Sequence, residues 1–417
     1  MHRHNLRSSI RARALGAALV FMGAAGAAAA QPTLGQAFEA AWTRQPEAVA
    51  LQLRRDAAQA QGRAARAWTP EPMALALSNR TDRWQGDDGV REREIGLAVP
   101  LWLPGERARS GALADAEAGA VESRIGAARL RVAEALREAH WTLQRSAVDV
   151  ALARDRQAAA QRLAADVARR LAAGDLARAD QHQADGALAA ADSSLAQALA
   201  AQVVARQKWR AVVGTAIAEP PVDAIVAMER VPPENAAVDT DAHPALRDLQ
   251  DRAAVAERAA ALSTVRTRAN PELTLASTRE RDGRGEPALR TVTLGLRIPF
   301  GAGDRQAAAA ANAHAEALDL QTQLSMERER IAGERDAARA QVDAARAPFT
   351  AAQRRARLAA ESRGFFDKSF RLGETDLPTR LRIEGEAIEA QRQEARSRID
   401  LAAAISHWRQ SLGLLFE

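Results

Sequence analysis

The sequence contains two copies of one pattern, and this duplication limits the folds that the chain can adopt. The segment 95–100 (IGLAVP) returns 199 residues later as 294–299 (LGLRIP). The pair Gly174-Asp175 returns at the same offset as Gly373-Glu374. A constant offset between separate landmarks indicates an internal repeat, so we predict that the chain is built from two similar structural units.

The repeat boundaries and the composition divide the chain into four segments. We predict a signal peptide at 1–30, a first repeat at 31–217, a linker at 218–242 and a second repeat at 243–417. The linker is rich in proline, at positions 220, 221, 232 and 233. Each repeat is expected to hold a helix, a strand pair and a long helical hairpin.

The first thirty residues are typical of a cleaved secretory signal. Arginines in the first thirteen residues precede an uncharged apolar run at 14–27, and alanines at 28–30 follow. This order of basic, apolar and small residues is characteristic of such a signal. An N-terminal membrane helix is the alternative, but the run is shorter than the ~20 residues that a span needs. No later run of 18 uncharged apolar residues occurs, so we expect no membrane-spanning helix in the mature chain.

Each repeat also contains two segments in which apolar residues alternate with polar or small ones, as in β-strands. They lie at 72–80 and 92–101 in the first repeat and at 273–278 and 291–300 in the second. Four strands with an apolar outer face cannot close into a barrel. Three chains supply twelve strands, which can close, and a closed barrel is the β-structure that a bilayer tolerates.

The remaining sequence predicts long helices. Residues 106–172 contain no proline and carry apolar residues at steps of three and four, which indicates one helix about 100 Å long. Helices at 46–68 and 176–213 are shorter, and together they match its length, so we expect them to stack end to end beside it. The second repeat predicts a long helix at 304–371, kinked at Pro348, and a returning helix capped by Asp376.

These elements predict a fold that is mainly α with a small β part. A long α-helical barrel would continue a transmembrane β-barrel, with four strands per chain and twelve in a trimer. The aromatic content is only 4%, and alanine-rich helices that pack at close range fit this composition better than a conventional globular core does.

Several classes of function find no support in the sequence. The net charge of +5 is spread along the chain without a basic block, so we expect no nucleic-acid binding. Cysteine is absent, and the histidines lie far apart, mostly on predicted helix surfaces, so we expect neither a metal site nor catalytic residues. No phosphate-binding loop precedes a lysine. We therefore predict that the protein is not an enzyme and holds no cofactor.

The whole mature chain resembles the TolC family of outer-membrane efflux channels. The resemblance rests on the signal, the duplication, the strand pairs that end in Val-Pro or Ile-Pro, the long helices and the glycine turns. Residues 270–273 (NPEL) and 281–283 (RDG) resemble the cobalt-zinc-cadmium branch, which exports heavy metals.

The resemblance implies a passive homotrimer that carries metal ions or small toxic compounds across the periplasm and the outer membrane of a Gram-negative bacterium. It also implies docking to a periplasmic adaptor protein and to an inner-membrane pump, expected to be proton-driven. The turns at 171–176 and 371–377 would be the docking tips. Their predicted docking residues are Gly174, Asp175, Leu176, Gly373, Glu374, Asp376 and Leu377.

Two further sets of residues follow from the resemblance. Outer-membrane lipid would contact one face of the strands through Leu97, Val99, Leu294, Leu296 and Ile298. At the periplasmic entrance, Thr379 and Arg382 stand where the family's archetype has aspartates, and Glu384 is the nearest carboxylate. We therefore predict a mixed entrance formed by Arg382 and Glu384.

A soluble periplasmic coiled-coil adaptor or scaffold is the alternative function. An adaptor would carry one helical hairpin set within β-domains, whereas this chain carries two copies of a hairpin and a strand pair. The alternating segments separate the two functions, because they contact lipid in a channel and water in a scaffold.

Overall fold

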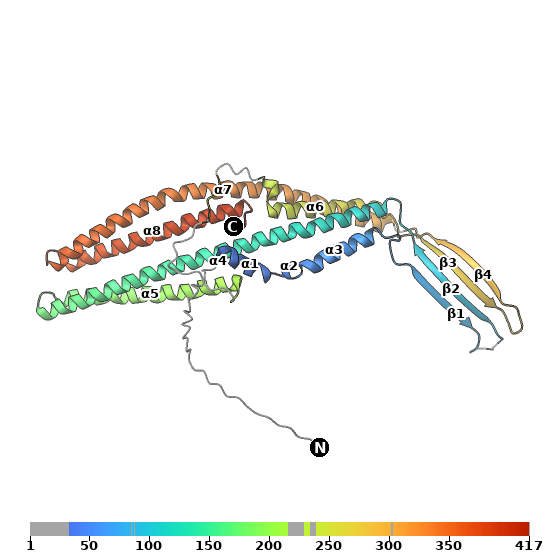
Figure 1. Ribbon diagram of the computed structural model, residues 1–417, viewed down its shortest axis with the longest axis horizontal. Helices are drawn as coiled ribbons and strands as arrows, with labels where there is room; N and C mark the ends of the chain where they lie inside the picture. Colours follow the sequence, from blue (N-terminus) through green and yellow to red (C-terminus); the bar gives the residue numbers. More distant parts are fainter. Residues whose placement is uncertain are drawn as a thin grey trace, which may run out of the picture. The chain divides into compact units, whose positions relative to one another are not determined.

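The computed structural model describes residues 33–84, 86, 88–215, 229–233, 239–301 and 303–416. The predicted signal peptide and most of the predicted linker lie outside these residues. Within them, the structure consists of long helices and one four-stranded antiparallel sheet (Figure 1). The fold is therefore mainly α with a small β part, as predicted.

The elements follow the same order twice along the chain. The first set is α1 (Leu34–Thr43), α2 (Pro46–Val49), α3 (Leu51–Ala65), β1 (Ala74–Thr81), β2 (Arg91–Pro100), α4 (Glu106–Ala173) and α5 (Arg178–Val213). The second set is the 3-10 turn η1 (Thr240–Ala242), α6 (Pro244–Ser263), β3 (Glu272–Arg281), β4 (Leu289–Arg297), α7 (Gly303–Arg371) and α8 (Leu377–Ser411).

The N-terminal helices differ from the single helix predicted at 46–68. The chain breaks at Ala50, whose backbone (φ −88°, ψ 0°) separates α2 from α3, and α3 ends before the prolines at 70 and 72. The helix α1 was not predicted. Its start is a capping box, in which Thr33 Oγ1 accepts from the Gln36 amide and the Gln36 side chain accepts from the Thr33 amide.

The long helices lie beside the shorter ones in the predicted manner. Within each repeat, α3 and α5 both pack on α4, and α6 and α8 both pack on α7. Contacts between the repeats run from α4 to α6 and from α4 to α8. The helix α7 stays helical through Pro348. The packing order is therefore α3–α4–α6–α7 near the sheet and α5–α4–α8–α7 towards the turns at the far end (Figure 1).

A buried carboxylate joins the sheet to the helices. Glu106, the first residue of α4, is fully buried and accepts from the Leu103 amide at 3.1 Å. Asn270 Nδ2 donates to it at 2.6 Å, and Arg266 Nε donates at 2.8 Å. Asn270 also donates to the Leu101 carbonyl, so this side chain fixes the end of one strand pair to the start of the other.

The largest cluster of buried side chains lies at the middle of the helices, where α1 and the end of α5 meet α4. Phe38, Leu136 and Trp209 are buried in it. Phe416, near the end of the chain, packs against Phe38 with the ring centroids 5.7 Å apart. Side chains from near the two ends of the described chain thus share one core.

The described part of the linker is held by a buried ionic network. Glu229 accepts two hydrogen bonds from Arg137 of α4, at 3.0 and 2.9 Å, and lies 3.0 Å from Arg409 Nε of α8. Ser406 of α8 donates to the same carboxylate. All three charged side chains are at least nine-tenths buried. The linker therefore ties the first repeat to the second at mid-length.

We expect Glu229→Gln to lower the free energy of unfolding by about 3–5 kcal/mol, because it leaves two buried arginines without their counter-charge. Chemical unfolding of the purified protein in detergent measures this loss. Glu122→Gln is the control, since its ion pair with Arg55 is exposed and contributes less than about 1 kcal/mol. Equal losses in the two variants would contradict the role of the network.

Candidate functional site

The sheet has one apolar face, and the structure brings the predicted strand residues together on it. Leu97 pairs with Leu275, which pairs with Leu294. In the next row, Val99 pairs with Leu273, which pairs with Leu296. Ile298 lies two residues beyond Leu296 and is also exposed. Because side chains alternate along a strand, these rows form one surface, and Leu294 is 70% exposed on it.

The two edges of this sheet have no partner strand among the described residues. The strand order is β1-β2-β3-β4, so β1 and β4 each leave one row of backbone amides and carbonyls unpaired. Water or another strand must satisfy these groups. The apolar face and the open edges make this sheet the clearest candidate for contact outside the chain.

Exposed aromatic side chains lie beyond both ends of the strands. Trp68 and Phe300 are on the helical side of the sheet, and they are 93% and 88% exposed. Trp84 follows β1 at the opposite end and is 91% exposed. Aromatic residues at both limits of an apolar β surface are typical of membrane–water interfaces.

The predicted docking residues lie at the two helical turns. Gly174 (φ +86°) ends α4 in the left-handed conformation that favours glycine, and Gly373 (φ +77°) follows α7 in the same way. Asp376 caps α8 by accepting from the Thr379 amide at 3.2 Å. Asp175 does not cap α5; the N-cap is Ala177, whose amide donates to Asp180 at 3.0 Å.

Within both turns, some of the predicted docking residues are exposed and others are buried. Gly174, Asp175, Gly373, Glu374 and Asp376 are exposed. Leu377 is fully buried and Leu176 half-buried in a cluster with Phe370, where the two hairpins meet. These two leucines therefore support the turns, and the exposed residues are the ones that another protein can reach.

Both predicted entrance residues have ionic partners within the chain. Arg382 is exposed and donates to Glu386 one helical turn later, at 2.6 Å. Glu384 is half-buried and lies 3.6 Å from Arg363 of α7. This segment of α8 thus carries charges of both signs that are already paired within the chain.

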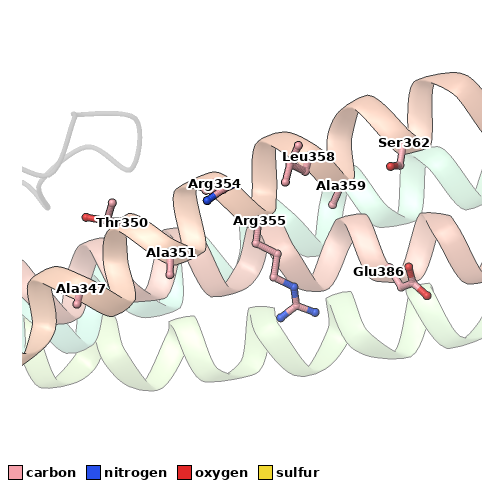
Figure 2. Close-up of a pocket in the computed structure, with 9 residues that line it drawn as sticks. All are labelled: Ala347, Thr350, Ala351, Arg354, Arg355, Leu358, Ala359, Ser362 and Glu386. Carbon is pink, nitrogen blue, oxygen red and sulfur yellow. The ribbon is translucent and has the colours of Figure 1, made fainter.

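A groove of ≈ 820 Å³ lies on α7 and α8, and sequence analysis did not predict it. Figure 2 shows Ala347, Ala351 and Leu358 along α7 and Glu386 on α8. Arg355 reaches towards α8, where it donates to Gln393 at 2.7 Å. The groove is long and lined mostly by small side chains, so its shape suits a packed helix better than a small ligand.

One helix in the described part of the chain, α5, is long and apolar enough to cross a membrane by length and composition. Its apolar residues are mainly alanine, and Asp192 lies within them. It packs along α4 and leaves most of the apolar stretch exposed. An exposed face of small residues is also what close packing against another helix requires.

Two histidines that were expected on helix surfaces are buried. His140 packs edge-on to Trp141, with centroids 4.7 Å apart, and lies 6.1 Å from Trp209. His243 is buried beside Gly413. Among the described residues, no group of three or more His, Asp or Glu side chains is arranged to hold a metal ion. Burial lowers the pKa of His140 to about 4.

The pKa of His140 predicts a loss of stability in acid. An unfolded imidazole binds a proton below about pH 6.5, whereas the folded one stays neutral down to about pH 4. Acidification from pH 7 to 4 should therefore destabilise the wild type by about 3 kcal/mol more than it destabilises His140→Gln. Unfolding at both pH values measures the difference. His182→Gln, at an exposed site on α5, should behave as the wild type, and equal acid sensitivity in all three would contradict the prediction.

Comparisons with known proteins complete this description. No protein-family model matches the sequence. No curated protein matches it either. Solved structures do match, although their sequences are only distantly similar. The outer-membrane protein VceC from Vibrio cholerae has 17% identity and a TM-score of 0.73, with 92% of this chain and 97% of that chain covered.

Two further structures agree. CusC, studied for folding and transmembrane channel formation, has 14% identity and a TM-score of 0.77, covering 92% of this chain and 93% of its own. The Neisseria gonorrhoeae outer-membrane channel MtrE, in its open state, has 15% identity and a TM-score of 0.70, covering 92% and 89%. The chain therefore has the fold of the TolC-like outer-membrane channels, as its sequence predicted.

Proposed function

We propose that this protein is a passive, trimeric outer-membrane channel of a tripartite efflux system. It would be exported by its N-terminal signal, and its helical part would extend into the periplasm. Substrates, either metal ions or small toxic compounds, would pass through it across the periplasm and the outer membrane of a Gram-negative bacterium.

The apolar sheet face with two open edges is the observation that carries this proposal. In a bilayer no water is available to the unpaired backbone groups of β1 and β4, so they need strand partners. Three copies supply twelve antiparallel strands, an even number that can close around a lumen. Closure would turn the leucine rows towards lipid and remove both edges.

The helices have open sides that correspond to the sheet edges. In the order α5–α4–α8–α7, the outer members are α5 from the first repeat and α7 from the second. The sheet likewise ends in β1 from the first repeat and β4 from the second. Contact between unlike sides of identical copies generates a closed ring when the rotation permits. A single rotation that relates one copy to the next can therefore close both the β-barrel and the ring of helices.

The outer faces of α5 and α7 complement each other in size. On α7 and the first residue after it, Ala351, Leu358, Phe365 and Leu372 recur every seven residues and are all exposed; we call them the α7 stripe. On α5, Ala179, Gly186, Ser193 and Ala200 recur with the same spacing and are also exposed; we call them the α5 face. With the turns level, α7 and α5 run antiparallel, so large residues of the stripe can enter gaps between small ones.

The same two surfaces are complementary in charge. Residues 179–205 of α5 contain three aspartates and no lysine or arginine. Residues 354–371 of α7 contain six basic and two acidic side chains. Arg354 and Arg357 on α7 and Asp185 on α5 are exposed and form no ion pair with another described residue. Such complementarity favours the correct neighbour over other contacts.

The helical turns are the proposed docking site for a periplasmic adaptor. Gly174, Asp175, Gly373, Glu374 and Asp376 would contact the adaptor, with Leu176 and Leu377 beneath them. The adaptor would link this channel to an inner-membrane pump that supplies the energy. Arg382 and Glu384 would form a mixed entrance of weak ion selectivity. The cobalt-zinc-cadmium branch remains a proposal that rests on the sequence motifs at 270–273 and 281–283.

A soluble adaptor or scaffold explains the helices but not the sheet. It would expose the leucine rows and both strand edges to water, which favours aggregation. The paired strand segments in both repeats therefore favour the channel.

Leu296→Arg tests the proposed lipid face. A charge near the middle of the bilayer should oppose insertion by about 2–4 kcal/mol, so less protein should reach the outer-membrane fraction and fewer channels should form in planar bilayers. Thr293→Arg is the control, because Thr293 is on the opposite face, which would line the lumen. Normal trimer yield and conductance for Leu296→Arg would contradict the assigned face, and a wild type without conductance would contradict the channel.

Leu358→Asp combined with Phe365→Asp tests the proposed helix contact. Two carboxylates in the α7 stripe would face the acidic part of α5, so we expect the detergent-resistant trimer to dissociate. Gel migration and mass photometry measure the oligomer. Gln353→Asp, an exposed change outside the stripe, should leave the trimer intact. A stable trimer in the double variant would exclude this contact.

A further inference from the structure

Three arginines lie side by side across the sheet. Arg93 of β2 pairs in register with Arg279 of β3, and Arg279 pairs with Arg290 of β4. All three side chains are exposed. We call these residues the arginine row. They are far apart in the sequence, and only the strand register brings them together.

The arginine row is on the apolar face of the sheet. The adjacent row on that face is formed by Ile95, Ser277 and Val292, each two residues from an arginine of the row. Two residues further in the opposite direction, Arg91 pairs with Arg281. The apolar surface therefore ends at a basic border near the loops.

The glutamates of the strands at this level are on the face opposite the arginine row. Glu92, Glu94 and Glu280 are on the other face, where Arg80 lies 3.9 Å from Glu92. None of the three guanidinium groups of the row forms an ion pair or hydrogen bond with another described residue. The row is thus a concentrated positive charge without a counter-charge from the described part of the chain.

This arrangement is unfavourable in isolation. Like charges at directly opposite positions of neighbouring strands destabilise a sheet, because their side chains are about 5 Å apart at Cβ. A bound anion would reverse that effect. The planar guanidinium group donates two parallel hydrogen bonds, which fit the oxygens of a phosphate group.

The depth of the row identifies the source of the phosphate. Phe300 and Arg290 are ten residues apart, about 33 Å of extended chain. With the ~40° tilt of barrel strands, this corresponds to about 25 Å, the height of the apolar band of such barrels. The sheet extends away from the helices (Figure 1). Arg93 and Arg290 lie near the starts of β2 and β4 and Arg279 near the end of β3, so the row is near the end of the sheet that is far from the helices. In the proposed orientation it is level with the headgroups of the outer leaflet.

We propose that the arginine row binds the phosphate groups of anionic lipid headgroups in the outer leaflet. This inference rests on the proposed function, because it needs the sheet to be in a membrane. In a trimer the row occurs three times around the barrel. The phosphates would neutralise the row and anchor the barrel at a fixed depth.

The test uses the full mature chain in phosphatidylcholine nanodiscs with bisphosphorylated lipid A, with lipid A stripped of phosphate, or with added inorganic phosphate. Native mass spectrometry and a fluorescence titration measure binding. We expect bisphosphorylated lipid A to bind, and Arg93→Gln/Arg279→Gln/Arg290→Gln to weaken it about 100-fold, since each basic side chain contributes about fivefold. Arg279→Gln alone should weaken binding about fivefold, which keeps the test available if the triple variant does not fold.

The control is Arg80→Gln/Arg297→Gln, which removes two arginines from the opposite face of the same sheet and should bind as the wild type. Unchanged affinity in the triple variant, equal affinity for stripped lipid A, or displacement by millimolar inorganic phosphate would each overturn the proposal. Conductance in phosphatidylcholine bilayers separates the two ideas. If the wild type conducts but does not bind lipid A, only the proposed lipid site is refuted. If the wild type never inserts into the bilayer, the proposed channel is refuted as well.

Discussion

The need of backbone amides and carbonyls for partners governs the structure described here. The sheet has four strands, and its outer strands β1 and β4 each leave one side unpaired. The leucine-rich face suits lipid better than water. In lipid, no water can hydrogen-bond the unpaired edge groups, so they need strands of other copies as partners. A single chain therefore carries an incomplete β-structure, and the proposed trimer would cover the apolar face with lipid and pair both edges.

The helices are constrained by the distance between the axes of neighbouring helices. In the proposed trimer, a ring of helices that continues a twelve-stranded barrel would bring neighbouring helix axes close together, which small side chains permit. Alanine supplies this along α4, α5 and α7, and the few large side chains gather at a central core and at the turns. Arginine and glutamate pairs between helices add specificity at exposed positions rather than much stability. The buried Glu229 network is the exception, because its charges are removed from water.

Period-two and proline signals predicted the strands within a few residues, and the strand face followed, because alternation alone decides which residues share a side. Features that depend on tertiary register were not predictable. Arg93, Arg279 and Arg290 carry no common local pattern, and the burial of His140 is hidden in a helix whose alanines obscure its periodicity. The break at Ala50 was missed because alanine favours helix. The helix α1 was missed although Thr33 and Gln36 gave a readable capping signal.

The contact between Phe38 and Phe416 brings the two ends of the described chain together at mid-length. Both lie far along the helices from the strands and from the turns. Joining residues near these two positions with a short peptide and opening the chain elsewhere, for example between the repeats, would preserve every helix and strand. The topology is thus close to circular, and the order in which the two halves are synthesised is not dictated by the final architecture.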